Sequence, residues 1–411
     1  MTSLAPLTQS TLSRLVTRPV EAKGFGPPPT GLPADAIRLV GGVPADEALP
    51  VAELASAFAA ALSASGAGVQ SLQYSSAPGI PALRGWIANW ESDASGAVDP
   101  DRVLVTNGAL HGLSLVFAAL LDPGDLVAVE SPTFPVALRV LDHYGARLQP
   151  VPHVGDRLDL DDFERHLQAG RIPKLFYAIP DFHNPTGTTL AAEDRSRLTG
   201  LAERYGFVVL SDNPYRELRF RGTDVPDFPL DSDRVVRVNT FSKTLGPGLR
   251  LGWVVAPDWL LPALLRLRAN VDQHASLVTQ SAVAHLLGQE GVFDATVASA
   301  RVLYRERADL LAEVLTAEAG DLVSVPEARG GIFTWVSVTD PGINLADVRL
   351  AANALGADFS SGRYFDPASS GLYADSLRLG FTNQSPENLR LGARRIAEAI
   401  RKVHSAPRLR R

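Results

Sequence analysis

Six short runs of the chain are apolar at nearly every position, without the alternation of apolar and polar residues that marks a half-buried strand. Uninterrupted runs of Val, Ile and Leu are typical of strands in a parallel sheet that helices cover on both faces. The predicted strands are residues 102–106, 126–130, 174–180, 207–211, 235–239 and 252–256. Helix-like segments such as 111–121 and 191–206 separate them, and Gly206 is a suitable C-terminal glycine for the second helix. This alternation predicts right-handed βαβ units in one wound, mostly parallel α/β sheet with helices on both faces.

The pattern changes near residue 310. A helix over residues 292–318 leads into three segments that we predict to be antiparallel strands, namely LVSV, GGIFTWVSV and SLRLGFT. A last helix follows, with Ser385 as its N-cap and with Pro386 and Glu387 in its first turn. We therefore expect an N-terminal arm (1–24), a large domain (66–309), a smaller α+β domain (25–65 and 310–405) and a C-terminal tail (406–411).

The composition narrows the possible functions. At 411 residues, 45% of them hydrophobic, the chain is long enough for a large core and two packed units. The net charge of −6 argues against nucleic acid or an anionic membrane as the main partner. The absence of cysteine excludes disulfides, zinc–thiolate and iron–sulfur sites and a cysteine nucleophile. No run resembles a signal-peptide core or spans a bilayer, which needs roughly 20 apolar residues, so we expect a soluble cytoplasmic protein.

Five polar loops, each containing Gly or Pro, follow the carboxyl ends of predicted strands. Their sequences are TNGALHG, ESPTFP, DFHNPTG, DNPY and TFSKTLGPGLR. Ligands of wound α/β sheets bind outside the carboxyl ends of the strands, so the five loops together predict one large ligand pocket. No glycine fingerprint for nucleotides, Walker loop, HExxH or GxSxG motif occurs at these loops. No two of the eight histidines are spaced i,i+4, so we interpret His111 and His183 as polar neighbours and predict no metal site.

Lys243 lies in the last of these loops, in a chain where only four of the 39 basic residues are lysines. Arginine stays protonated, whereas a lysine amine can lose its proton and condense with an aldehyde. Pyridoxal 5'-phosphate (PLP) carries such an aldehyde, and a carboxylate beside its ring nitrogen keeps the ring protonated as an electron sink. Asp212, at the end of a buried strand, is placed for that task, although alone it would equally be a turn or capping aspartate. The two residues together predict PLP as the cofactor.

Six segments resemble, in the same order, the motifs of fold-type I PLP-dependent aminotransferases of class I/II. They are GGVPADEALP (41–50), SLQYSSAPGIPALRGWIA (71–88), NPTG (184–187), SDNPYREL (211–218), TFSKTLGPGLRLGW (240–253) and LRLGFTN (377–383). The resemblance covers residues 25–405 and is greatest to the 2-aminoadipate and aromatic aminotransferases and to the effector domain of MocR-type regulators. It implies a homodimeric enzyme of amino-acid metabolism and biosynthesis that moves an amino group between an L-amino acid and a 2-oxo acid through a Schiff base on Lys243.

The resemblance implies a role for each residue around the cofactor ring. Lys243 resembles the Schiff-base lysine that also moves a proton between the substrate α-carbon and the cofactor. Asp212 resembles the acceptor of the pyridine N–H, and Phe134 resembles the aromatic residue that stacks on the ring. Asn184 and Tyr215 would hydrogen-bond the phenolic oxygen and stabilise its anion.

The resemblance also implies a phosphate site and a substrate site. The residues for the phosphate are Arg250, Thr240 and Ser242, with the backbone of Gly108, Ala109 and Leu110 at a helix N-terminus. Tyr74 resembles the tyrosine that reaches the phosphate of the partner subunit, so the active sites would be shared within a homodimer. Arg378 resembles the bidentate clamp on the substrate α-carboxylate, which would lie near the backbone of Gly42.

Three features depart from the family pattern. Ala109 stands where a serine or threonine is usual, SDN around Asp212 lacks the usual second acid, and DFSSGRYF (358–365) replaces a loop with Pro-Gly before its aromatic residue. Arg363 in that loop either recognises a second anionic group or faces solvent.

Structural interpretations also stay open for three of the implied site residues. Phe134 could be an ordinary core residue, and Arg378 could cover apolar surface at a strand edge. Tyr74 could have a purely structural role.

Two other functions stay open as well. One keeps the fold and the cofactor but carries out β- or γ-elimination, replacement, cyclisation or decarboxylation in specialised metabolism. The altered 358–365 loop and Ala109 favour it. The other is a regulator that only senses PLP. Such a regulator needs a DNA-binding domain before its effector domain, and about 25 residues are too few for a helix-turn-helix unit.

Overall fold

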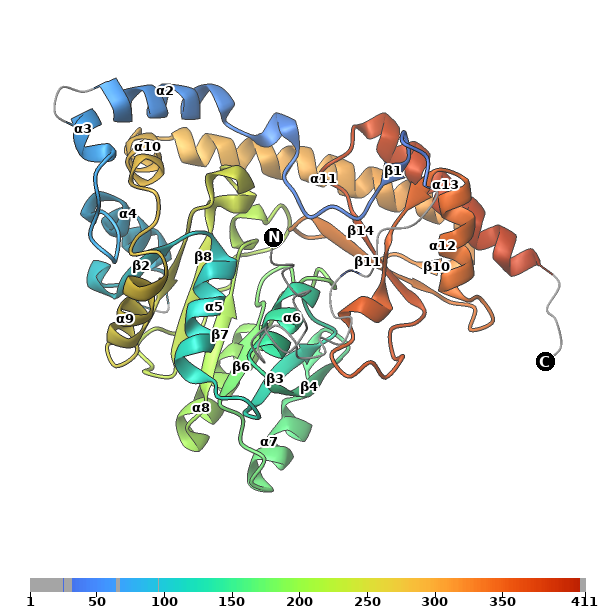
Figure 1. The fold of residues 1–411 in the computed structure, drawn as a ribbon. Coiled ribbons are helices and arrows are strands. Elements are labelled where there is room, and N and C mark those ends of the chain that lie inside the picture. Colours follow the sequence, from blue (N-terminus) through green and yellow to red (C-terminus); the bar gives the residue numbers. More distant parts are fainter. Residues whose placement is uncertain (1–24, 26–31, 64–66, 95, 407–411) are drawn as a thin grey trace, which may run out of the picture.

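The computed structural model describes residues 25, 32–63, 67–94 and 96–406 (Figure 1). Its largest element is an eight-stranded sheet in the order β2-β9-β8-β7-β6-β3-β4-β5. The strands are β2 (Val103–Thr106), β3 (Leu126–Ser131), β4 (Arg147–Val154), β5 (Arg157–Leu158), β6 (Leu175–Ala178), β7 (Val208–Asp212), β8 (Val235–Thr240) and β9 (Gly252–Val255). The predicted arm (1–24), and the predicted tail after residue 406, lie outside the described residues.

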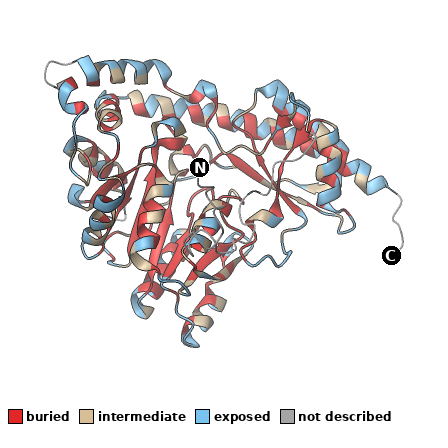
Figure 2. Ribbon diagram, in the orientation of Figure 1, coloured by how far each residue is buried: buried red, intermediate tan, exposed pale blue. Residues whose placement is uncertain are grey.

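This sheet is buried on both faces, as its apolar strands predict (Figure 2). Successive strand residues face opposite hydrophobic clusters, so that Phe176 packs in one cluster and Tyr177 in the other. The helices on the Tyr177 side are α5 (Ala109–Leu120), α6 (Pro135–His143) and α9 (Leu261–Val271). The helices on the Phe176 side are α4 (Pro81–Glu91), α7 (Leu160–Gln168), α8 (Ala192–Tyr205) and α10 (Leu277–Leu287). The predicted wound, mostly parallel α/β sheet is therefore confirmed.

The direction of β9 differs from the prediction. Strands β4, β3, β6, β7 and β8 run parallel, but β9 is antiparallel to both of its neighbours, β8 and β2. Placing residues 252–256 among the parallel strands was therefore wrong. The connection from β8 to β9, residues 241–251, is shorter than the helical crossover that a parallel pair needs. Because β2 is antiparallel to β9, the carboxyl ends of β2, β3, β6, β7 and β8 still lie at one edge.

Strand β4 was not predicted, because Pro150 and Pro152 interrupt its pattern. It pairs with β3 along most of its length, whereas β5 covers only His153 and Val154 on its other side. Most of β4 is therefore an edge strand, where proline is tolerated because no neighbour needs its missing N–H.

The ends of three helices agree with the sequence. Helix α8 is followed by Gly206, whose φ is +86°. Helix α13 (Pro386–Ser405) begins after Ser385, and the Ser385 side chain accepts a hydrogen bond from the Asn388 N–H. Helix α11 (Val292–Ala319) matches the predicted long helix, and Figure 1 shows it running above both main sheets.

The four-stranded sheet has the order β10-β11-β14-β13 and is antiparallel, as predicted. Its strands are β10 (Val323–Ser324), β11 (Phe333–Val338), β13 (Ser360–Ser361) and β14 (Ser376–Gly380). A separate pair joins β1 (Ile37–Arg38) to β12 (Ala357–Asp358), which links the early part of the chain to the late part. The remaining helices are α2 (Val51–Ser63), α3 (Ala67–Ser71) and α12 (Leu345–Ala354). The domain limits near residues 65 and 310 stay a prediction.

No helix of the described residues combines the length and the apolar character needed to cross a bilayer.

Candidate active site

A cavity of about 360 Å³ lies at the carboxyl edge of the eight-stranded sheet. Most of the site residues predicted from the sequence line it: Gly42, Ala109, Leu110, Phe134, Asn184, Asp212, Tyr215, Thr240, Ser242, Lys243, Arg250 and Arg378. Gly108 lies directly before α5, next to this lining, and Tyr74 lies elsewhere. The fold thus brings together residues that come from all five of the polar loops.

Lys243 ends a single 3-10 turn (Phe241–Lys243) that directly follows β8. Its Nζ donates a 2.6 Å hydrogen bond to the carbonyl oxygen of Gly42. Burial and the positive charge of Arg378 lower the pKa of Lys243 to about 8, against the opposing effect of Asp212. A lysine nucleophile must be neutral, so this lowered pKa suits one.

Asp212 is buried at the end of β7 and faces the cavity. Its Oδ2 accepts a 2.7 Å hydrogen bond from the Tyr177 hydroxyl. Its Oδ1 is buried but has no hydrogen-bond partner among the described residues. Burial raises the pKa of Asp212 to about 6, whereas the Tyr177 hydrogen bond and the charge of Lys243 lower it. Buried polar atoms are almost always paired, so Oδ1 marks a position for a donor from outside the protein.

Tyr177 was not among the site residues predicted from the sequence. Burial and the Asp212 charge raise the pKa of Tyr177 well above its usual value, so its hydroxyl stays protonated and donates to the carboxylate. Tyr177 is the one polar side chain in the buried strand β6. That isolated polar group is the signal by which sequence reasoning could have found it.

Asn184 connects two other predicted groups. Its side-chain NH₂ donates to the Tyr215 hydroxyl at 3.4 Å, and its Oδ1 accepts a 2.7 Å hydrogen bond from Arg378 Nη1. Arg378 Nη2 donates to the Val40 carbonyl oxygen at 2.9 Å, while Arg378 Nε has no partner among the described residues. Burial raises the pKa of Tyr215, so its hydroxyl stays protonated at neutral pH. Tyr215, Asn184 and Arg378 therefore form one buried hydrogen-bonded chain.

Three aromatic rings surround the Arg378 guanidinium. Its Cζ lies 3.8 Å from the ring centre of Phe333, 4.9 Å from that of Phe365 and 5.1 Å from that of Phe25. Burial lowers the pKa of Arg378 to about 9, and the ring faces offset part of the cost of burying its charge. These rings come from three distant segments, so no local motif indicates that they meet around Arg378.

Two glycines let Arg250 approach the N-terminus of α5. Gly108 has a φ of +82°, and a Cβ on it would lie 2.8 Å from Arg250 Nη2. A Cβ on Gly252 of β9 would lie 2.8 Å from the backbone nitrogen of Ala109, at the start of α5. The first N–H groups of a helix have no intrahelical partner, so this end of α5 and the Arg250 cation together suit a phosphate.

Two hydroxyl groups lie in the same lining. Thr240 Oγ1 and Ser242 Oγ are 2.8 Å apart. They supply hydroxyls close to the loop in which Ala109 replaces the usual serine or threonine.

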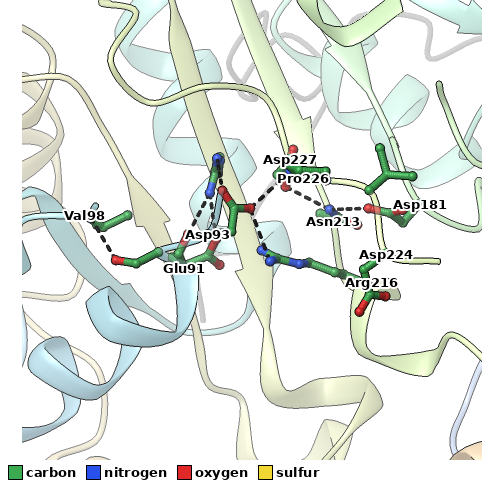
Figure 3. Close-up of polar contacts among 12 residues, drawn as sticks. Glu91, Asp93, Val98, Asp181, Asn213, Arg216, Asp224, Pro226 and Asp227 are labelled. Atoms are coloured by element: carbon green, nitrogen blue, oxygen red, sulfur yellow. Dashed lines mark hydrogen bonds and ion pairs between the residues drawn. The ribbon is translucent and has the colours of Figure 1, made fainter. Parts of the chain in front are cut away.

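Asn213, which follows Asp212, lies in a buried polar network (Figure 3). Its NH₂ donates to Asp181 Oδ2 at 2.9 Å and to Asp227 Oδ2 at 2.8 Å. The Arg195 guanidinium lies 3.0 Å from the Asp181 carboxylate and compensates its negative charge. An acid in place of Asn213 would bring three carboxylates together and could not donate to two of them when ionised. This explains why SDN lacks the usual second acid.

Three further residues differ in how they relate to the cavity. Phe134 lines it, and its ring centre lies 6.5 Å from that of Phe25. Tyr74 is 83% exposed, with its ring 5.9 Å from that of His274. The Arg363 guanidinium is exposed and lies 4.8 Å from the ring centre of Tyr364, which favours the solvent-facing interpretation.

Comparisons with known proteins agree with this geometry. Residues 35–396 match the family model for aminotransferase class I and II. The chain is 32% identical to the 2-aminoadipate transaminase of Thermus thermophilus, over 89% of this chain and 90% of that protein. It is 30% identical to aromatic-amino-acid aminotransferase 1 of Thermococcus litoralis, over 90% of this chain and 88% of that protein. The crystal structure of a Thermus thermophilus α-aminoadipate aminotransferase complexed with N-(5'-phosphopyridoxyl)-L-leucine matches with a TM-score of 0.86 and 30% identity, over 97% of this chain and 100% of that chain.

The fold and the cavity thus define a PLP-dependent enzyme of fold type I. The chain belongs to the class I and II aminotransferases, enzymes that use PLP to transfer amino groups, which confirms the resemblance found in the sequence. The residues present fit PLP, because the unpartnered Asp212 Oδ1 suits the ring N–H and the Lys243 amine suits the aldehyde.

The pKa of Lys243 leads to a prediction about cofactor uptake. Because the neutral amine is the nucleophile, the rate at which PLP-free protein takes up PLP should rise with pH, with a midpoint near the Lys243 pKa of about 8. Arg378→Leu removes a charge that lowers this pKa, so its midpoint should move up towards the ordinary value of 10.5. Stopped-flow absorbance measures both rates. The ionisation of free PLP is the same for wild type and for Arg378→Leu. Equal midpoints for the two proteins would therefore contradict an effect of the Arg378 charge on the pKa of Lys243.

Proposed function

We propose that this chain moves an amino group between an L-amino acid and a 2-oxo acid, as a cytoplasmic homodimer in amino-acid biosynthesis, with Lys243 as the residue that bonds to PLP. The observation that carries the proposal is the meeting of Lys243, the unpartnered Asp212 Oδ1 and the buried Arg378 in one cavity. When bound, PLP supplies an aldehyde that condenses with amines and a ring that withdraws electrons from the substrate α-carbon.

Lys243 has two tasks in this proposal. Its neutral amine would bond to the cofactor aldehyde, and the free Nζ would move the proton at the substrate α-carbon. A pKa of about 8 keeps a fraction of the amine neutral at neutral pH. The carbonyl oxygen of Gly42 holds Nζ at the cavity.

Asp212 holds the proton on the ring nitrogen. Asp212 lines the cavity, its Oδ1 has no hydrogen-bond partner among the described residues, and Tyr177 donates to its Oδ2. This hydrogen bond favours the ionised carboxylate, which is the form that accepts the ring N–H. Tyr177 acts through Asp212 and is therefore a positioning residue.

The remaining polar groups orient the cofactor and the substrate. Asn184 and Tyr215 donate to the phenolic oxygen, and Arg378 binds the substrate α-carboxylate with its planar fork. The phosphate is held by Arg250, Thr240, Ser242 and the first amides of α5, beginning with Ala109 and Leu110 after Gly108. Ala109 contributes only its backbone N–H, so Thr240 and Ser242 supply the hydroxyl groups that bind the phosphate.

The cavity walls favour an aromatic or apolar substrate side chain. Phe25, Phe134 and Phe333 line the cavity. Its described cations are Lys243, Arg250 and Arg378, each with a task at the cofactor or the α-carboxylate. A second carboxylate, such as that of 2-aminoadipate, would therefore meet no further positive charge from the described lining.

The homodimer is inferred from Tyr74 and its surroundings. Tyr74 is 83% exposed, and Val69 and Leu72 nearby are 66% and 72% exposed. A second copy of the chain would cover this apolar segment, and Tyr74 would then reach the phosphate in the partner's cavity.

The proposed reaction is tested by a half-reaction. Holoenzyme mixed with an aromatic L-amino acid, and no 2-oxo acid, should convert its PLP to pyridoxamine phosphate, measured by absorbance and chromatography. Lys243→Ala should lose the visible band of lysine-bound PLP and should form no product. Arg378→Leu should need at least about tenfold more amino acid, since hydrogen bonds to charged groups contribute ~1.5–3 kcal/mol. Substrate loss with release of ammonia or carbon dioxide but no pyridoxamine phosphate would instead indicate elimination or decarboxylation.

Tyr177→Phe tests the positioning of Asp212. Loss of a hydrogen bond to a buried carboxylate, ~1.5–3 kcal/mol, should lower kcat by about tenfold or more and leave KM nearly unchanged. Because this hydrogen bond lowers the pKa of Asp212, its loss should move the acid limb of the kcat–pH profile to higher pH. Tyr144→Phe is the matched control, since the Tyr144 hydroxyl pairs with Ser114 instead. An unmoved acid limb in Tyr177→Phe would show that Tyr177 has no such role.

A mixture of two inactive variants tests the shared site. Lys243→Ala and Tyr74→Ala chains, unfolded and refolded together in equal amounts, should recover about a quarter of wild-type activity, because half of the dimers are mixed and each has one intact site. Lys243→Ala mixed with a chain carrying both substitutions is the control and should stay inactive. No recovery in the first mixture would mean that Tyr74 does not serve the partner's site.

A further inference from the structure

A buried cluster of two histidines and a carboxylate lies outside the lining of the active-site cavity. Glu130 lies in β3, His153 in β4, and His183 in the loop after β6. The side chains of Glu130 and His183 are each 1% exposed, and that of His153 is 10% exposed. One nitrogen or oxygen atom from each residue lies within 4.8 Å of those from the other two. Three distant segments thus bring their side chains to one point.

The cluster contains buried polar atoms without partners. Glu130 Oε2 accepts a 2.6 Å hydrogen bond from the Ile179 N–H, and His183 Nδ1 pairs with Thr186 Oγ1 at 2.9 Å. His183 Nε2 and both ring nitrogens of His153 have no hydrogen-bond partner among the described residues. His183 Nε2 points into the cluster, 3.4 Å from Glu130 Oε2. Unpaired buried polar atoms are rare, and a bound ion is one of the few causes.

The distances suit coordination better than hydrogen bonding. Two metal–ligand bonds of about 2.1 Å at a tetrahedral angle hold their ligand atoms about 3.4 Å apart. Both histidine–carboxylate separations have this length: His153 Nε2 is 3.4 Å from Glu130 Oε1, and His183 Nε2 is 3.4 Å from Glu130 Oε2. The contact with Thr186 orients the His183 ring through Nδ1 and leaves Nε2 for an ion, as is usual for histidine ligands.

The charges of the cluster also suit a cation. The buried Glu130 carboxylate faces two histidine rings, each with a nitrogen 3.4 Å from one of its oxygens. A cation would also neutralise a buried negative charge.

We propose that Glu130, His153 and His183 bind one Zn²⁺ ion at a site separate from the cofactor. Two imidazoles and a carboxylate are ligands that zinc accepts, whereas Mg²⁺ and Ca²⁺ prefer oxygen ligands alone. His153, the least buried of the three, gives the ion access from solvent. The ion ties β3 and β4 to the loop that also carries Asn184. Sequence reasoning interpreted His183 as a polar neighbour because its two companions lie far away in the chain.

Zinc content tests the proposal directly. Untagged holoenzyme, dialysed against Zn²⁺ and then desalted, should retain one zinc per chain by mass spectrometry, and Co²⁺ in its place should show the d–d absorption of a tetrahedral site. His153→Gln should lose this ion, because it removes the most exposed ligand with little change in volume. His166→Gln is the matched control: its ring lies 3.5 Å from the Asp162 carboxylate but outside the cluster, so zinc should be retained.

Zinc content and Tm test the zinc site independently of the active site. Lys243→Ala should keep its zinc, since the amine is not a ligand of the ion. Chelation should lower the Tm of wild type and leave that of His153→Gln unchanged. Wild-type protein that leaves the desalting column without stoichiometric zinc, or His153→Gln that retains as much as wild type, overturns the proposal. Loss from His153→Gln but not from His166→Gln supports it, whatever the rate of amine transfer.

Discussion

The short connection from β8 to β9 is the constraint on which the candidate active site depends. A parallel β9 would need a helical crossover that carries residues 241–251 away from the sheet edge. The direct return keeps Lys243 and Arg250 on one segment, and both of its ends are held in adjacent buried strands. It also places Gly252 against the first residues of α5. Arg250 has a φ of +51°, a conformation that non-glycine residues seldom adopt and that clusters at functional sites.

Burial changes the pKa values of the charged groups in the site. Each group has a specific neighbour that reduces the free-energy cost of burying its charge. The pKa of Lys243 falls and that of Asp212 rises, which is typical of titratable groups in catalytic clefts. Tyr177 keeps a hydrogen bond on one Asp212 oxygen and leaves the other to the cavity. Arg378 is held between Asn184 and aromatic rings. The same logic extends to Asn213, where an amide rather than an acid can bridge two buried aspartates.

The loop after β6 serves three polar sites with neighbouring residues. Asp181 belongs to the buried arginine network, His183 to the histidine–carboxylate cluster, and Asn184 to the active site. Phe182, between Asp181 and His183, has a φ of +48°. This sharp turn directs Asp181 and His183 to different sides. A bound ion at His183 would therefore constrain the backbone next to Asn184.

The wound α/β fold and the strands that carry the candidate site are readable from the sequence, which also predicts Lys243 and Asp212 as site residues. These features are local, because an apolar run, a capping residue or a loop motif is complete within a few neighbouring residues. The antiparallel direction of β9 is local too, since the 241–251 connection is too short for a helical crossover. By contrast, the contact of Tyr177 with Asp212, the rings around Arg378, and the meeting of Glu130 with His153 and His183 arise only in the folded chain. Each of these depends on which side chains from distant segments pack together, and the burial of all segments around one core settles that jointly.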